Sequence, residues 1–253
     1  MSLQEKMSEF VNKIEYRDLP EEAIMVAKQS LLDYFGVTLA GSVAPIGGII
    51  KSYLEELGSV GPSTVVGLGL KTSCPNAAFA NGVLGHALDF DDSNPSLLGH
   101  PSVPVAPSVL AIAEYTEASG EELLTAYSVG VEIECKLGVV VNPAHMSKGW
   151  HCTSTLGAFG ATASAVKLLD LDVEQMMYAF GIAASESAGI RANFGTMTKP
   201  FHAGRAAENG IVAAMLAKRG FTSNKNAIDD EFGYLKVTTG EYNTEPIENL
   251  GNP

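Results

Sequence analysis

Apolar residues recur at helical spacing along most of the chain. One segment opens at Pro20, the favoured first position of a helix, and repeats apolar residues every three or four positions up to Leu39, with Gly41 following its end. Ser119 with Glu122 and Asp172 with Gln175 have the spacing of capping boxes, which predicts that a long helix starts after each pair. Further helices are expected over residues 4–16, 46–57, 75–89, 104–118, 154–169 and 203–219.

Only residues 63–70 read as strand. This stretch is rich in β-branched residues and follows a Gly-Pro pair, so it predicts a small hairpin near residues 64–71. Strands do not alternate with helices, which argues against a doubly wound sheet. The segments 157–161 and 179–184 are almost entirely Gly, Ala and other uncharged residues, as expected of helices buried by others. The predicted fold is all-α with at most one short hairpin.

The composition agrees with a large folded core. Of 253 residues, 46% are apolar and only 18% charged, against about 25% charged in an average domain. The net charge of −13 disfavours binding to nucleic acid or anionic membranes. Cys74, Cys135 and Cys152 are widely spaced, which argues for a reducing compartment and against a structural zinc site. With no apolar run at the N-terminus, the sequence reads as a soluble cytoplasmic protein.

Reactive side chains concentrate in three segments, of which the first spans residues 86–102. It contains His86, Asp89, Asp91, Asp92 and His100. The carboxylates are expected at the C-terminal end of a helix, where negative charge opposes the helix dipole and costs free energy. The cluster therefore suggests function, although Asp91 and Asp92 could equally cap and solvate a turn.

The other two segments supply more histidine and the positive charge. Trp150 and His151 precede a small-residue helix, and His151 alone could be an ordinary core histidine. Lys199 precedes a proline and is expected to be extended, with His202 and Gly204 opening the following helix. Such a helix N-terminus beside a lysine predicts a carboxylate or phosphate pocket, against the alternative of a plain surface loop.

Several common chemistries lack their motifs. Mixed His and Asp residues permit zinc, iron or manganese, but no H-E-x-x-H, H-x-H or comparable spacing occurs. The chain also lacks a G-x-S-x-G elbow, a G-x-G-x-x-G after a strand, and a Walker loop. The sequence thus gives no support for a serine hydrolase or a nucleotide-binding protein.

The segments, taken together and in this order, resemble the MmgE/PrpD family of 2-methylcitrate dehydratases, cis-aconitate decarboxylases and iminodisuccinate epimerases. The resemblance extends over essentially the whole chain. It is carried by Asn81-Gly82, His86-Ala87-Leu88-Asp89-Phe90-Asp91-Asp92, Gly99-His100-Pro101-Ser102, Trp150-His151 and Thr198-Lys199-Pro200-Phe201-His202-Ala203-Gly204. It implies a cofactor-independent and metal-independent enzyme acting on a small di- or tricarboxylate.

The resemblance also implies site residues. The family's active-site positions fall on Asp89, Ser93, His100, His151 and Lys199. Because a histidine can accept and return a proton near neutral pH, His100 is the expected general acid/base. Asp89 would orient it, His151 would act as a second proton-transfer group, and Lys199 would clamp a substrate carboxylate. Further substrate contacts are predicted at Ser93, Asp92, His202 and Gly204. The four catalytic candidates are expected to converge on one cleft.

Family members pair a helical domain with an α/β lid and typically form homodimers. Residues 1–253 correspond to the N-terminal helical domain, and the family's lid and returning C-terminal helices have no counterpart in this sequence. An apolar rim is therefore expected to be covered by a second copy or by a lid-bearing chain. The predicted activity is a lyase; the alternatives are a dicarboxylate epimerase, a helical scaffold without catalysis, and a metal hydrolase.

Overall fold

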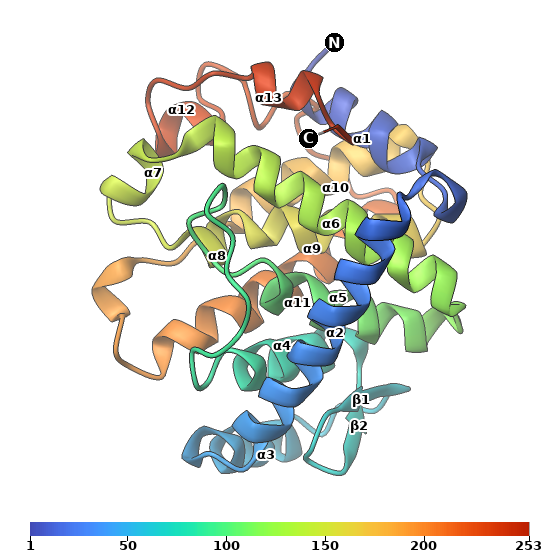
Figure 1. Cartoon of the computed structure of the whole chain (residues 1–253), viewed down its shortest axis with the longest axis vertical. Coiled ribbons are helices and arrows are strands. Elements are labelled where there is room, and N and C mark those ends of the chain that lie inside the picture. The colour runs from blue at the N-terminus through green and yellow to red at the C-terminus, as the bar shows by residue number, and fades with distance from the viewer. Residues whose placement is uncertain (253) are drawn as a thin grey trace.

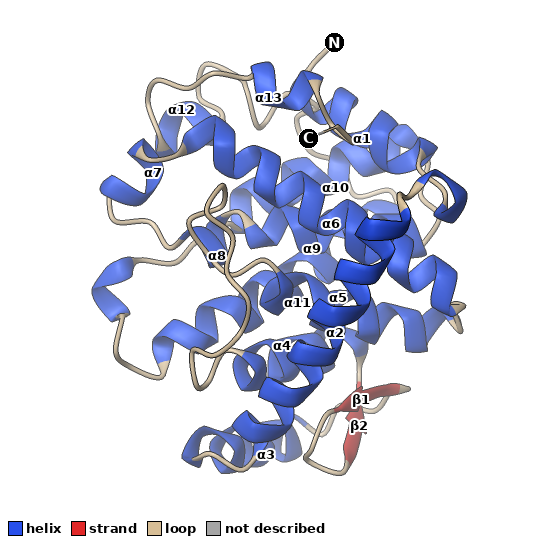
Figure 2. Cartoon of the chain, viewed as in Figure 1, coloured by secondary structure: helices blue, strands red, loops and turns tan. Residues whose placement is uncertain are grey.

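The computed structural model describes residues 1–252 and is dominated by helices (Figures 1 and 2). This confirms the predicted all-α class with one hairpin. The α-helices are α1 (Leu3–Lys13), α2 (Glu21–Ser42), α3 (Pro45–Leu57), α4 (Cys74–Gly85), α5 (Ser102–Thr116), α6 (Gly120–Val141), α7 (Ala144–Ser147), α8 (Cys152–Thr155), α9 (Gly157–Leu168), α10 (Val173–Glu186), α11 (Thr198–Lys218), α12 (Tyr234–Thr238) and α13 (Glu245–Glu248), with short 3₁₀ turns at Tyr16–Asp18 and Arg191–Asn193. The strands β1 (Ser63–Val65) and β2 (Leu70–Thr72) form the predicted antiparallel hairpin.

Helices α4, α9 and α11 form the centre of the domain, and small residues let them approach closely. A Cβ built on Gly82 of α4 would lie 2.7 Å from the Cα of Gly204 in α11. A Cβ on Gly210 would lie 2.6 Å from the side chain of Ala161 in α9. Larger residues at these crossings would push the backbones apart. The small-residue stretches of the sequence therefore mark helix contacts, as predicted.

The structure confirms both capping boxes. The Ser119 hydroxyl accepts a hydrogen bond from the Glu122 backbone N–H, and the Glu122 carboxylate accepts one from the Ser119 N–H. Asp172 and Gln175 make the same reciprocal pair at the start of α10. These signals work from sequence because both partners lie within one turn of helix.

The buried face of α2 differs from the prediction. Instead of a stripe ending at Phe35 and Leu39, which are 37% and 52% exposed, the helix buries Tyr34 and Thr38. Gly41 lies inside the helix rather than beyond its end. A Cβ there would meet the Leu84 carbonyl of α4 at 2.0 Å, so this glycine permits a helix crossing.

The start of α11 also differs from the prediction. The helix begins at Thr198, so Lys199 lies in its first turn instead of an extended segment. His202 and Gly204 are buried one turn further along and do not form the helix N-terminus. Proline tolerates the first turn of a helix because its missing N–H has no partner there, and here that preference outweighs the extended bias of the preceding residue.

The hydropathy of the helices was compared with that of membrane-spanning helices. Among residues 1–252, no individual helix is both long and apolar enough to cross a bilayer; α2 and α3 pass such a test only as a pair bent by 84°.

Candidate active site

The loop between α4 and α5 is held in place along its length. It begins at His86, the residue that caps α4, and turns sharply at Asp89, whose φ of 58° lies in the left-handed region. Leu97 anchors the loop in the core with no exposed surface. The backbone N–H of His100 donates to Thr153 Oγ1 (3.0 Å), which ties the loop to α8 (Figure 1). The predicted site residues therefore sit on a fixed scaffold.

A pocket of about 400 Å³ opens where this loop meets two other segments. One is the Trp150 segment before α8, and the other precedes and begins α11. We call it the histidine pocket. Its walls are formed by Ser93, Asn94, Pro95, Leu98, Gly99, His100, Met146, Trp150, His151, Cys152, Thr153, Arg191, Phe194 and Lys199.

Lys199, Asp89 and His100 form a connected group at the edge of this pocket: Lys199 and His100 line it, and Asp89 lines a neighbouring pocket of about 380 Å³ that shares Lys199. Lys199 Nζ donates to Asp89 Oδ1 at 2.5 Å, and the same oxygen lies 3.5 Å from His100 Nε2. Burial opposes ionisation of Asp89, but the lysine bond and charge outweigh it and lower the pKa of this carboxyl. Residues separated by more than a hundred positions thus meet, as expected. Their chemical roles stay predictions.

A second carboxylate, Asp91, bridges two histidines beneath the pocket. Both of its side-chain oxygens lie 2.9 Å from His86 Nδ1, and Oδ2 lies 3.2 Å from His100 Nδ1. Burial raises the pKa of Asp91, yet the hydrogen bonds from the two histidines reverse this and bring it to about 2. For His100, burial lowers the pKa, but the bond and charge of Asp91 leave it above its ordinary value.

His151 has the opposite electrostatic character. It is buried, its Nδ1 lies 3.1 Å from His202 Nδ1, and its ring packs edge-on against Phe194. Burial, with a smaller effect from the neighbouring histidines and Lys199, lowers the pKa of His151 to about 2. It is therefore neutral at physiological pH and can exchange a hydrogen bond but holds a proton poorly.

The remaining predicted substrate contacts are placed differently. Ser93 lines the histidine pocket. Asp92 instead accepts hydrogen bonds from the backbone and hydroxyl of Ser102 at the start of α5 (3.1 and 2.5 Å). His202 faces an adjoining pocket of about 330 Å³, and Gly204 lies in the α4–α11 crossing. Asp92 thus holds the start of α5, and Gly204 permits the close crossing of α4 and α11. Neither residue lines the histidine pocket, so their predicted substrate contacts have no geometric support.

The four groups His86, Asp89, Asp91 and His100 offer ligand atoms within 4.8 Å of one another. Both carboxylates already accept hydrogen bonds, Asp91 from two imidazoles and Asp89 from an ammonium. A dication at this position would also face the charge of Lys199 across a distance of a few ångströms. The arrangement fits a hydrogen-bonded acid–base cluster better than a metal centre.

Sequence reasoning did not assign a role to Asp91, His86 or Arg191. Arg191 lines the pocket, with its guanidinium carbon 5.7 Å from the Phe194 ring centre and Lys199 Nζ at 5.2 Å from the same ring. Both cations thus lie within cation–π distance of the same aromatic ring. The only signal in the sequence was the number of cations in this segment of an acidic protein.

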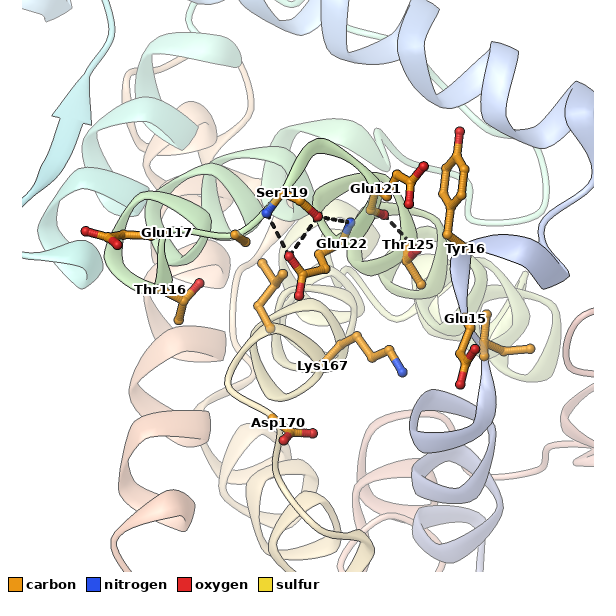
Figure 3. A pocket seen from close by; sticks show the side chains of 13 residues that line it. Glu15, Tyr16, Thr116, Glu117, Ser119, Glu121, Glu122, Thr125, Lys167 and Asp170 are labelled. Atoms are coloured by element: carbon orange, nitrogen blue, oxygen red, sulfur yellow. Dashed lines mark hydrogen bonds between the residues drawn. The ribbon is translucent and has the colours of Figure 1, made fainter.

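A larger pocket lies elsewhere, at the connection between α5 and α6 (Figure 3). It measures about 530 Å³, and we call it the acidic pocket. Its walls are formed by Ile14, Glu15, Tyr16, Thr116, Glu117, Ala118, Ser119, Glu121, Glu122, Thr125, Lys167, Leu168 and Asp170. None of the residues predicted for catalysis belongs to it.

Residues 5–247 match the MmgE/PrpD N-terminal domain. The chain belongs to the MmgE/PrpD family. Among curated MmgE/PrpD relatives, cis-aconitate decarboxylase of Homo sapiens is 35% identical over 92% of this chain and 50% of its own length. The Mus musculus cis-aconitate decarboxylase is 32% identical over 92% of this chain and 49% of its own length. The Aspergillus terreus enzyme is 28% identical over 90% of this chain and 48% of its own length. The chain spans about half the length of the relatives it matches.

Proposed function

We propose that this domain supplies the acid–base and carboxylate-binding half of a lyase that acts on a small di- or tricarboxylate. The observation that carries the proposal is the meeting of Lys199, Asp89 and His100 at the histidine pocket. The relatives named cis-aconitate decarboxylase support the same reaction class. Decarboxylation of cis-aconitate and dehydration of 2-methylcitrate are the two reactions we consider, without a cofactor.

The chemistry follows from the two kinds of side chain. Loss of CO₂ leaves an electron pair on the carbon that carried it, and an acid must return a proton there. His100 has a pKa above its ordinary value and can carry that proton. Lys199 and Arg191 place positive charge at the pocket to bind the remaining carboxylates and stabilise the electron-rich intermediate.

The difference in pKa between His100 and His151 favours a lyase over an epimerase. An epimerase that inverts a carbon by proton transfer needs a competent acid or base on each face. His151 lines the same pocket, but its pKa of about 2 and its bond to His202 make it a poor base. We therefore assign His151 to a hydrogen bond with substrate.

The apolar surface of α2 and α3 supports assembly into a homodimer. Leu32 and Val43 are 74% and 87% exposed, and Met25, Leu39 and Ile49 are each more than half exposed. Soluble monomers rarely leave a contiguous apolar patch of this kind uncovered. We propose that a second copy covers it, and a monodisperse monomer in sedimentation would contradict this.

The test of the activity uses the chain alone and together with a second polypeptide carrying the family's lid. Each sample is incubated with cis-aconitate and with 2-methylcitrate, and the products are followed by NMR. We expect turnover of one of them by the pair and little by the chain alone, because water has open access to the uncovered pocket. Absence of turnover of either compound by the pair would refute the proposal.

A further inference from the structure

The carboxylate of Asp91 lies where it can set the proton position on His100. Its side chain has no exposed surface, and its neighbours in the cluster are two imidazole Nδ1 atoms. The backbone carbonyl of Asp91 also lies 3.2 Å from His100 Nδ1. An ionised carboxylate and a carbonyl can only accept hydrogen bonds, so Nδ1 of His100 must carry a proton in this geometry.

The opposite edge of the ring is then fixed as well. With the proton on Nδ1, neutral His100 keeps the lone pair of Nε2 free, on the edge that faces Asp89 and the Lys199 ammonium. This is the side on which a carboxylate bound to Lys199 would lie. A flipped tautomer would place a lone pair against the lone pairs of Asp91 and lose the bond.

The imidazole of His86 fixes the position of the Asp91 carboxylate. The His86 ring is fully buried, Nδ1 contacts both oxygens of Asp91, and Nε2 has no hydrogen-bond partner among residues 1–252. The backbone N–H of His86 donates to Gly82 O (3.2 Å), which continues the end of α4. The imidazole thus connects the Asp91 loop to a rigid helix and supplies a donor that a buried carboxylate requires.

We propose that Asp91 and His86 are positioning residues that act through His100. They form a buried His86–Asp91–His100 chain that keeps the proton of neutral His100 on Nδ1 and aims Nε2 at the substrate. The proposal rests on the proposed function only in assigning proton transfer to His100. The tautomer itself is a property of the folded chain and can be measured without any reaction.

Asp89 is also an acceptor, but its Oδ1 lies 3.5 Å from His100 Nε2 and already accepts from Lys199, so it favours a proton on Nε2 less than Asp91 favours one on Nδ1. Asp89 and Lys199 lie at the Nε2 edge, and His151 stacks on His86 at a ring distance of 5.9 Å. The positive charge of Lys199 repels a proton on His100 and so lowers the pKa of this histidine. Asp91 is therefore the group that both fixes Nδ1 and favours the protonated ring.

The direct experiment is NMR of the imidazole nitrogens in the ¹⁵N-labelled chain. The sequence holds five histidines, so single His→Gln variants assign each signal. We expect neutral His100 to carry its proton on Nδ1 and to titrate above the ordinary histidine value. A proton on Nε2 of His100 in the unsubstituted chain would overturn the proposal.

Asp91→Asn tests the source of the preference, because it removes the charge with little change in shape. We expect the Nδ1 preference to weaken, because only the Asp91 backbone carbonyl and a neutral amide oxygen remain as acceptors there, and the His100 pKa to fall. Asp92→Asn is the matched control, since this neighbouring carboxylate bonds Ser102 instead. An equal effect of both variants would refute a specific role of Asp91.

Kinetics of the chain with its lid-bearing partner separate this inference from the proposed function. Asp91→Asn should lower kcat about 10²–10⁴-fold, the range of acid–base catalysis, with KM nearly unchanged. His86→Leu should have a smaller effect, which His86→Gln partly rescues by keeping a donor. If no polycarboxylate is turned over but the NMR results hold, the proposed function fails and the positioning role stands. If turnover depends on His100 but not on Asp91, the positioning role fails.

Discussion

The histidine pocket and the acidic pocket are each lined by one lysine, but they are built differently. In the acidic pocket, the hydrogen bonds of Glu121 and Glu122 are local: Ser119 bonds Glu122, and Thr125 bonds the Glu121 carbonyl one turn earlier (Figure 3). Lys167 bonds a residue far along the chain, but its acceptor is the backbone carbonyl of Asn12 and no titratable group. In the histidine pocket, Lys199 bonds a residue 110 positions away. The acidic pocket is also the larger of the two. The proposed site therefore differs from the acidic pocket in the long-range meeting of titratable groups, and it is not the larger of the two.

The two lysines show the same contrast. Lys199 is paired with Asp89 beside a histidine whose pKa is raised. Lys167 donates to the Asn12 carbonyl, and burial lowers its pKa although Glu15 and Asp170 lie nearby. In the acidic pocket Glu122 caps α6, and the five carboxylates that line the pocket would repel an anionic substrate.

The largest expected difference between the pockets is in turnover. When the chain is assayed together with a lid-bearing polypeptide, His100→Gln should reduce kcat about 10²–10⁴-fold because the proposed proton-transfer group is lost. Lys167→Gln in the acidic pocket should change kcat less than about twofold, since local caps persist without it. A substantial loss with Lys167→Gln would remove the distinction between the pockets.

Ligand binding should separate the two lysines by a smaller factor. Trp150 is the only tryptophan and lines the histidine pocket, so its fluorescence can report binding of tricarboxylates. Lys199→Met should weaken binding about 10- to 100-fold, the value of a hydrogen bond to a charged group. Lys167→Met serves as the control. Equal weakening by the two lysine variants would show that the net charge of the whole protein, and not a specific contact in the histidine pocket, controls anion binding.

The pH dependence of stability should depend on the histidine pocket. Because the folded pKa of His151 is about 2, the unfolded chain binds its proton first, near pH 6.5. The stability that comes from neutral His151 is present above pH 6.5 and is lost as pH falls, by up to about 1.4 kcal/mol per pH unit. His151→Gln should flatten urea-derived stability between pH 6.5 and 4.5. A slope identical to that of the unsubstituted chain would contradict the buried neutral histidine.

The smallest effect is expected from a cap in the acidic pocket. Ser119→Ala removes the side-chain acceptor for the Glu122 N–H and should cost about 1 kcal/mol of stability in thermal unfolding. Tricarboxylate binding followed through Trp150 should not change. Loss of binding together with the cap would mean that the acidic pocket is coupled to the site.

The sequence by itself determined the class of the fold, the hairpin, both capping boxes and the segments that carry the site. These features depend on partners within a few residues of each other, as in Ser119 with Glu122, or on motifs that are contiguous in the chain. The resemblance to the family added the expectation that Asp89, His100 and Lys199 act together.

Only the tertiary structure decided which residues meet and which are buried. The buried face of α2 contains Tyr34 and Thr38, and Gly41 on this helix allows a close crossing with α4. Glu134 of α6 is fully buried with neither oxygen bonded within residues 1–252, and burial raises its pKa well above its ordinary value. Asp91 became the bridge between His86 and His100 because the loop returns to the end of α4. Burial and long-range hydrogen bonds arise from helix packing, which local spacing along a chain does not encode.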